Sequence, residues 1–179
     1  MTGFHVIRNN IRSASNRWFE IPAATALAKL GMRPATATIF GILSSFAATY
    51  FVSQGQFVIA GVLVFISGLF DLLDGALARR GGITSRRGAL LDSTADRVSE
   101  FAVLLGMILY FTATDTSNST GAVLTLIALA GSMLISYIRA RAEGLDLSGQ
   151  RGFMTRPERV FIIGIGLLVG QPLVTVWVL

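Results

Sequence analysis

The sequence predicts an all-α membrane protein, a polytopic transmembrane helix bundle of five to six spans. Of its 179 residues, 53% are hydrophobic and 14% are charged, and the mean hydropathy is +0.65. This composition is typical of membrane proteins. Several apolar runs approach 20 residues, the length at which a helix crosses a bilayer. All fifteen basic residues fall in three segments between these runs: 1–33, 79–97 and 139–159.

Residues 1–33 are expected to form an amphipathic juxtamembrane segment ahead of a transmembrane domain at 34–179. Five basic residues alternate there with apolar and aromatic ones, a pattern that favours the membrane surface. An ordinary amphipathic helix packed on protein is the alternative. No signal peptide is expected, because the first long apolar run begins only near Pro34.

The helical spans are predicted at about 35–53, 57–79, 88–113 and 121–140, with a fifth beginning near Val160. Pro34 suits the first turn of the first span, and Gly81-Gly82 marks a turn after the second. A polar segment, 141–158, separates the fourth span from the fifth. The last seven residues resemble the start of a sixth span that the sequence does not complete.

The distribution of basic residues also predicts the topology. By the positive-inside rule, the N-terminus and the acidic residues described next face the cytoplasm. We expect a multi-pass protein of the plasma membrane. The net charge of +5 is explained by basic residues that contact anionic lipid and set the topology. We expect no nucleic acid as partner. The chain has no cysteine, so its redox compartment cannot be read.

Four of the ten acidic residues lie in one short, otherwise apolar stretch. Asp71 and Asp74 are spaced i,i+3, and Asp92 and Asp96 are spaced i,i+4, so each pair projects from one face of its helix. A short loop joins the two helices, which are therefore expected to be antiparallel neighbours with converging acids. A carboxylate costs about 2.5–3.5 kcal/mol near a bilayer centre, so compensation is needed. Divalent cations suit oxygen-only ligands.

Four converging carboxylates can hold two divalent cations, as in a two-metal phosphoryl-transfer site. Gly75 and Gly88 leave room for a ligand near the backbone. Arg79 can bind a phosphate through two hydrogen bonds, and one carboxylate can accept a proton from an attacking alcohol. Two other interpretations stay open at this point: a cation or proton pathway in a transporter, and structural salt bridges.

The stretch matches every fixed position of the pattern D-x2-D-G-x2-A-R-x8-G-x3-D-x3-D. This is the signature of the CDP-alcohol phosphotransferases, and the chain resembles that family from about residue 30 onward. The resemblance implies an integral membrane enzyme, usually dimeric, that transfers a phosphatidyl group from a CDP-lipid to an alcohol and releases CMP. It also implies two Mg²⁺ ions, with Mn²⁺ as an alternative.

The resemblance further implies a role for each matched residue. Asp71, Asp74 and Asp92 would ligate the metals, and Asp96 would be the general base and also touch a metal. The CDP-lipid site would be lined by Gly75, Arg79, Ser85 and Gly88 and by a turn at Arg33, Pro34 and Thr36. Ala35, within that turn, departs from the residue that members often carry, which puts a contact from the turn in doubt.

The acceptor is read from Ser136–Gly144 and Gly152–Arg159. These segments resemble phosphatidylinositol-phosphate synthases and their archaeal-lipid relatives, whose acceptor is inositol phosphate. Four arginines suit a dianionic acceptor, since guanidinium groups match phosphate oxygens: Arg139, Arg141, Arg156 and Arg159. The expected reaction therefore joins CDP-diacylglycerol and inositol phosphate. The alternative enzyme is a phosphatidylglycerophosphate synthase, whose acceptor is glycerol 3-phosphate. The alternative outside enzymes is a cation transporter. The arginines could instead anchor the protein to lipid headgroups.

Overall fold

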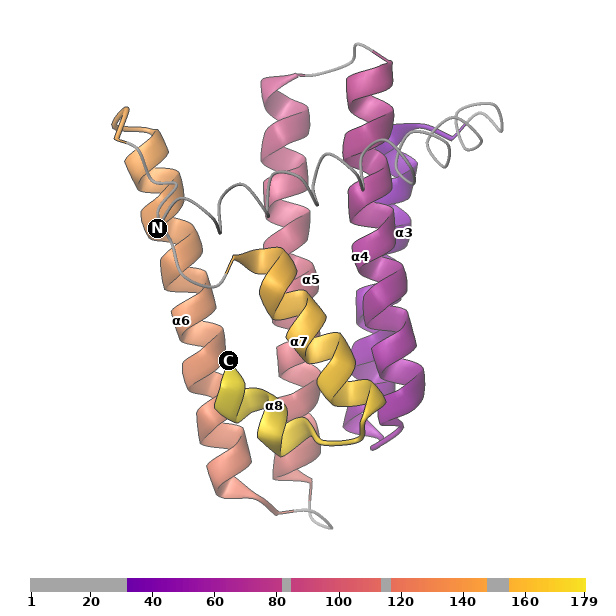
Figure 1. Ribbon diagram of the computed structural model, residues 1–179, viewed down its shortest axis with the longest axis vertical. Helices are drawn as coiled ribbons and strands as arrows, with labels where there is room; N and C mark the ends of the chain where they lie inside the picture. The colour runs from indigo at the N-terminus through magenta and orange to yellow at the C-terminus, as the bar shows by residue number, and fades with distance from the viewer. Residues whose placement is uncertain (1–31, 82–84, 114–116, 148–154) are drawn as a thin grey trace, which may run out of the picture.

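The computed structural model describes residues 32–81, 85–113, 117–147 and 155–179 (Figure 1). Its regular structure in these ranges is entirely α-helical, so the predicted all-α class is confirmed. The amphipathic segment predicted at 1–33 lies almost wholly outside the described residues. The helices are α3 (Pro34–Ser53), α4 (Phe57–Arg80), α5 (Arg86–Thr112), α6 (Ser119–Glu143), α7 (Arg156–Leu168) and α8 (Pro172–Val178).

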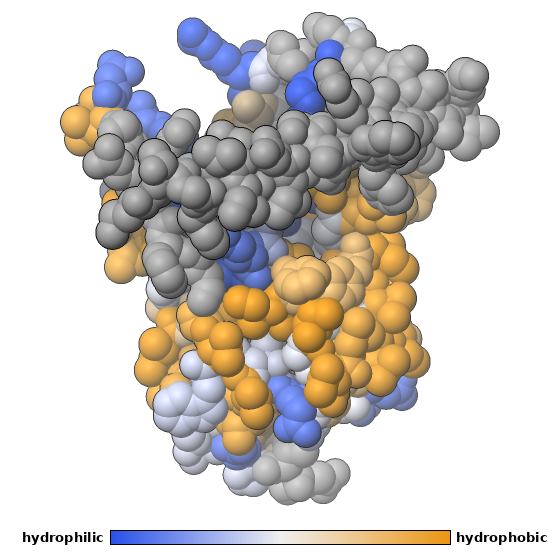
Figure 2. Space-filling view, in the orientation of Figure 1, coloured by the Kyte–Doolittle hydropathy of each residue, from blue (hydrophilic) through white to orange (hydrophobic). Residues whose placement is uncertain are grey.

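The chain surface has the distribution of side chains that a bilayer requires. By length and composition, α3, α4 and α6 are apolar enough to cross a membrane. Helix α5 has 27 residues but carries three acids, Asp92, Asp96 and Glu100. Large hydrophobic side chains are exposed on every long helix, and Figure 2 shows them covering the middle of the visible face. We conclude that this is a membrane protein.

The packing order differs from the sequence prediction. Helices α4 and α5 run antiparallel, as expected (Figure 1), but they touch each other little, because α3 packs extensively against both. Ser44 of α3 donates a hydrogen bond to the Leu63 carbonyl of α4 at 2.9 Å. On the other side, the backbone of Thr49 lies against Gly106 of α5. Helix α3 is therefore the element that sets the distance between the two acid-bearing helices.

Gly106→Ala is expected to destabilise the bundle by about 1–3 kcal/mol, the usual cost of overpacking. A Cβ at this position would lie 2.7 Å from the Thr49 carbonyl oxygen and 2.9 Å from the Thr49 Cα, so two backbones would have to separate. The control is Gly131→Ala on α6, where an added Cβ would lie more than 4 Å from every described heavy atom apart from its chain neighbours and its own helix backbone. The unfolding temperature in detergent should fall for Gly106→Ala and not for Gly131→Ala. Equal unfolding temperatures in the two variants would contradict this packing.

Helix α7 begins four residues earlier than predicted. We expected a span starting near Val160, but the helix starts at Arg156. Thr155 and Glu158 form a capping box, in which the Thr155 N–H donates to the Glu158 carboxylate at 2.5 Å. The 13 residues of α7 extend about 20 Å, less than the roughly 30 Å of a hydrocarbon core. Arg156 and Arg159 are consequently helical residues, not members of a polar loop.

Candidate active site

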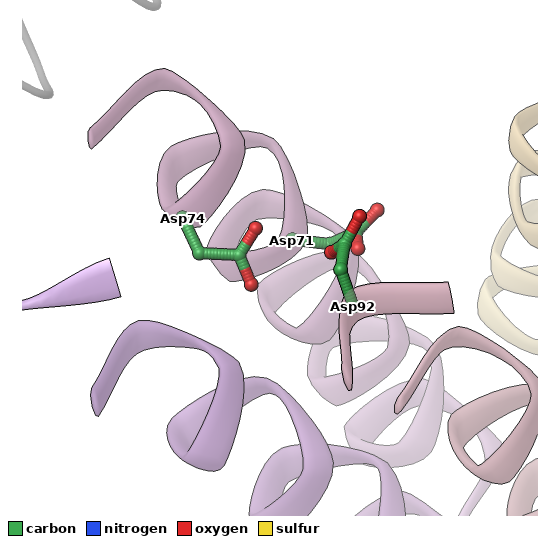
Figure 3. A group of neighbouring side chains, drawn as sticks. All are labelled: Asp71, Asp74 and Asp92. Carbon is green, nitrogen blue, oxygen red and sulfur yellow. The ribbon is translucent and has the colours of Figure 1, made fainter. Parts of the chain in front are cut away.

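Three of the four aspartates converge at one end of the bundle. Asp71 and Asp74 extend from α4 and Asp92 from α5 (Figure 3). Each offers one carboxylate oxygen, and these oxygens lie within 4.8 Å of one another. Asp74 is buried, with 4% of its surface exposed. Asp96 follows one turn further along α5 and does not belong to this group of three.

The donor set of this group suits a divalent metal ion. Three carboxylates this close repel one another, and the repulsion grows where burial removes water. Carboxylate oxygens are the ligands that Mg²⁺, Mn²⁺ and Ca²⁺ prefer, and a dication would offset most of the group's charge. No histidine and no cysteine belongs to the group, so the site favours hard cations over zinc.

Thr38 of α3 is a site residue that the sequence reasoning missed. Its hydroxyl donates a hydrogen bond to Asp74 Oδ2 at 2.7 Å. This contact orients the buried carboxylate and satisfies one of its oxygens, as outer-shell partners of metal ligands commonly do. The signal in the sequence was weak, because nothing about a single threonine 36 positions before Asp74 indicates that the two residues meet. Only the placement of α3 against α4 brings the two side chains together.

Thr38→Val should weaken divalent cation binding by about 10- to 100-fold, the usual effect of losing an outer-shell hydrogen bond. Valine keeps the shape of threonine but cannot donate to Asp74. Isothermal titration of purified protein with Mn²⁺ measures the change. Thr49→Val is the control, because the Thr49 hydroxyl donates to the Ser45 carbonyl of its own helix and to no acid among the described residues. Identical Mn²⁺ affinity in wild type and Thr38→Val would contradict the role given to this hydroxyl.

Arg156 of α7 connects two of the aspartates. Its Nη1 lies 2.7 Å from Asp71 Oδ2 and 2.5 Å from Asp96 Oδ1. The side chain of Arg156 is 18% exposed, and those of Asp71 and Asp96 are 30% and 25% exposed. Asp96 is thus linked to the metal-suited group through a guanidinium. The sequence predicted Arg156 near an acceptor phosphate, and the structure brings it directly to the acids.

A cavity of about 590 Å³ opens beside the acids, between the beginnings of α3 and α5 and the end of α4. Its volume is in the range of small-molecule sites. Of the residues predicted to bind CDP-lipid, all but Thr36 line it: Arg33, Pro34, Gly75, Arg79, Ser85 and Gly88, together with Asp74 and Asp92. Thr36 instead accepts a hydrogen bond from the Arg33 N–H at 3.1 Å and so caps α3. Ala35 lines the cavity, although it departs from the family's usual turn.

The two glycines of the cavity lie close to polar side chains. A Cβ at Gly75 would lie 3.2 Å from Arg79 Nη1, and one at Gly88 would lie 3.1 Å from Ser85 Oγ. Ser85 accepts a hydrogen bond from the Gly88 N–H at 3.0 Å and caps α5. The beginning of α5 therefore presents backbone N–H groups at the cavity wall, the arrangement that favours anions.

The arginines predicted for the acceptor phosphate do not all meet. Arg139 and Arg141 lie in the last turns of α6, whose upper end leans away from α5 and α7 in Figure 1. Arg159 has a different partner from the one predicted: Nε lies 2.6 Å from Glu100 Oε1, and Nη2 lies 2.8 Å from Glu100 Oε2. Arg159 is only 6% exposed. A buried guanidinium held by a carboxylate is poorly placed for a substrate, so we leave Arg159 out of the acceptor site.

The fold and the site together define a helical membrane protein with a carboxylate cluster and an adjoining cavity at one end. The family described as CDP-alcohol phosphatidyltransferase matches residues 32–179. This chain belongs to that family and is a transferase enzyme.

The chain is similar to several phosphatidylinositol phosphate synthases. A phosphatidylinositol phosphate synthase of Mycobacteroides abscessus is 40% identical over 148 residues, which are 82% of this chain and 67% of that protein. The Mycobacterium tuberculosis phosphatidylinositol phosphate synthase solved with manganese and citrate has a TM-score of 0.80 and 36% identity, covering 89% of this chain and 81% of that one. Its complex with CDP-DAG has a TM-score of 0.75 and 35% identity, with 89% and 88% covered. The chain thus spans about two thirds of the curated relative.

Proposed function

We propose that this enzyme transfers a phosphatidyl group from CDP-diacylglycerol to inositol phosphate, forming phosphatidylinositol phosphate and CMP. The observation that carries the proposal is the cavity shared by the carboxylate cluster, Arg79 and the start of α5. It combines acid ligands for cations with a basic side chain and backbone donors for phosphates. The names of the relatives support inositol phosphate as acceptor, and the complex of the related enzyme with CDP-DAG supports the donor.

Asp71, Asp74 and Asp92 would hold the metal in this proposal. We propose two Mg²⁺ ions, with Mn²⁺ able to substitute, and Asp96 as a further contact. When bound, the metal supplies positive charge that neutralises the diphosphate of the donor and the departing CMP. Thr38 keeps Asp74 oriented for this purpose. The solved relative with manganese supports the choice of a divalent ion.

The donor is bound by the residues around the cavity. Arg79 pairs with diphosphate oxygens, and Gly75 and Gly88 let the nucleotide approach the helix backbones. Arg33, Pro34 and Thr36 form the turn at the start of α3 that borders this site. Ser85 caps α5 and orients its N-terminal N–H groups.

The chemical step needs one base and one phosphate-binding arginine. Asp96 removes the proton from the acceptor hydroxyl, and that oxygen attacks the phosphorus attached to the lipid. The bond from this phosphorus to the oxygen of CMP breaks, and CMP leaves with its electron pair. Arg156, which contacts Asp96 at 2.5 Å, binds the phosphate of the acceptor, whereas Arg139 and Arg141 lie at the end of α6 that leans away from it. This places the acceptor beside its base.

We also propose the cellular setting. The N-terminus and the active site face the cytoplasm of a plasma-membrane protein, because the positive-inside rule assigns the basic segments 1–33, 79–97 and 139–159 to that side. A homodimer is proposed from the family, whose members are usually dimeric.

An acceptor panel tests the function. Purified protein with CDP-diacylglycerol and Mg²⁺ should release CMP with inositol 1-phosphate, and much less with glycerol 3-phosphate, inositol or serine. Preference for glycerol 3-phosphate would reassign the enzyme as a phosphatidylglycerophosphate synthase. An archaeal-type donor used better than CDP-diacylglycerol would assign it to archaeal-lipid synthesis. No CMP release with any acceptor, together with cation uptake into liposomes, would favour a transporter.

A further inference from the structure

Two charged pairs connect α5 and α7, one above the other. In the upper pair, Asp96 Oδ1 lies 2.5 Å from Arg156 Nη1. In the lower pair, both oxygens of Glu100 accept from Arg159, at 2.6 and 2.8 Å. The acids are spaced i,i+4 on α5 and the arginines i,i+3 on α7, so each set lies on one helix face. The two pairs therefore respond together to any movement of α7 along α5.

The lower pair is closed off from substrates. Glu100 is 4% exposed and Arg159 is 6% exposed. Glu100 does not belong to the aspartate group that suits a metal. Two parallel N–H···O bonds between planar groups fix both position and angle, which a single contact does not. The pair thus has the geometry of an anchor rather than of a binding site.

The upper pair is partly exposed. The side chain of Arg156 is 18% exposed, and its buried Nε has no hydrogen-bond partner among the described residues. A cavity of about 20 Å³, enough for one water molecule, adjoins Arg156 and is lined also by Ser67, Ser99 and Glu100. Arg156 therefore retains hydrogen-bonding capacity beyond its two aspartates. It is also the first residue of α7, so the position of that helix end decides where its guanidinium lies.

We propose that Glu100 and Arg159 are a positioning pair for the acceptor site. Helix α7 packs mainly against α4, and this pair adds the link between its first turns and α5 that holds Arg156 where it reaches both Asp96 and the acceptor phosphate. Neither residue touches substrate; both act through Arg156. The assignment of the acceptor phosphate to Arg156 rests on the proposed function.

Glu100 and Arg159 could instead contribute to stability alone, and a double variant distinguishes this role from the positioning of Arg156. Replacing both members of a buried ion pair by apolar residues is often neutral or stabilising, whereas removing one member leaves a buried, unpaired charge. Glu100→Leu combined with Arg159→Met should therefore recover the unfolding temperature lost in Glu100→Gln. It cannot restore the two directed hydrogen bonds. If the pair positions Arg156, the acceptor KM should stay raised in the double variant.

The experiment measures CMP release by the full chain, with the KM for inositol 1-phosphate and that for CDP-diacylglycerol determined separately. In Glu100→Gln and in the double variant, the acceptor KM should rise about tenfold or more, since misplacing a substrate-positioning group by about 1 Å can cost 100-fold. The donor KM should stay within about twofold, because the donor cavity has no wall from α7. Arg159→Lys keeps the charge and loses the two-point contact, so its acceptor KM should also rise. Asp146→Asn, the same loss of a carboxylate at an exposed turn, is the control.

A second measurement does not depend on turnover. The chain has no cysteine, so single cysteines introduced at the exposed positions Phe101 of α5 and Phe161 of α7 can carry a spin-label pair. Glu100→Gln should broaden the distance distribution between the labels, and Asp146→Asn should not.

The outcomes are distinguishable. An unchanged acceptor KM in Glu100→Gln and Arg159→Lys, or a wild-type KM in the double variant, overturns the positioning role. An unchanged label distribution in Glu100→Gln does the same. Wild-type protein that releases no CMP with inositol 1-phosphate instead overturns the proposed function, and the label distances still test the anchor.

Discussion

Asp96→Asn is expected to lower transfer to inositol phosphate by about 100- to 10,000-fold, the range for loss of a general base. Asparagine keeps the size of the side chain and cannot take the acceptor proton. Donor binding should persist, because Asp96 lies outside the three-aspartate group and does not line the large cavity. CMP release and equilibrium binding of CDP-diacylglycerol measure the two effects.

The control for this substitution is Asp146→Asn, which should behave as wild type. Thermal unfolding should also be recorded, because asparagine weakens the contact with Arg156, although Arg156 keeps its 2.7 Å contact with Asp71. Full turnover in Asp96→Asn would assign the proton to another group. Loss of donor binding at the same time would place Asp96 in the donor site.

Asp74→Ala is expected to abolish activity through loss of the metal. Asp74 is the most buried of the three grouped acids and the one that Thr38 orients. A ligand present at about 100 times its dissociation constant stabilises the folded state by about 2.7 kcal/mol. Millimolar Mg²⁺ or Mn²⁺ should accordingly raise the unfolding temperature of wild type and leave that of Asp74→Ala unchanged.

Potassium chloride at matched ionic strength is the control for this effect, and it should stabilise neither protein. The readout does not depend on the acceptor or on turnover. An equal metal-induced shift in wild type and Asp74→Ala would mean that the cation binds elsewhere, and the carboxylate group would then lose its assigned role.

Much of the fold could be predicted, because its signals are local. The first four spans were predicted to within about three residues at each end, from apolar runs bounded by Pro34, Gly81 and polar turns. The start of α7 was missed, because the charges of Arg156, Glu158 and Arg159 suggested a polar loop. Its capping signature, Thr155 followed by Glu158 with Pro157 between them, was present in the sequence.

The site was predicted less completely, because its other contacts are tertiary. Helical spacing places Asp71 with Asp74, and the short connection to α5 brings Asp92 near them. No periodicity predicts that α3 packs against both α4 and α5, so the Thr38 contact with Asp74 could not be foreseen. The partner of Arg159 was missed for the same reason. Glu100 lies 59 positions away, within an apolar run, and the sequence does not say which arginine it meets.

The position of the large cavity has a consequence for how such an enzyme meets its two substrates. The cavity wall includes Leu91 and Ala89 near the start of α5, and the neighbouring Leu90 is 69% exposed. A lipid donor can thus enter the cavity laterally from its leaflet, with its tails still surrounded by other acyl chains. The polyol acceptor reaches the site from water by ordinary diffusion. Encounter with the donor is a two-dimensional event, and its rate is governed by the mole fraction of donor in the surface rather than by its bulk concentration.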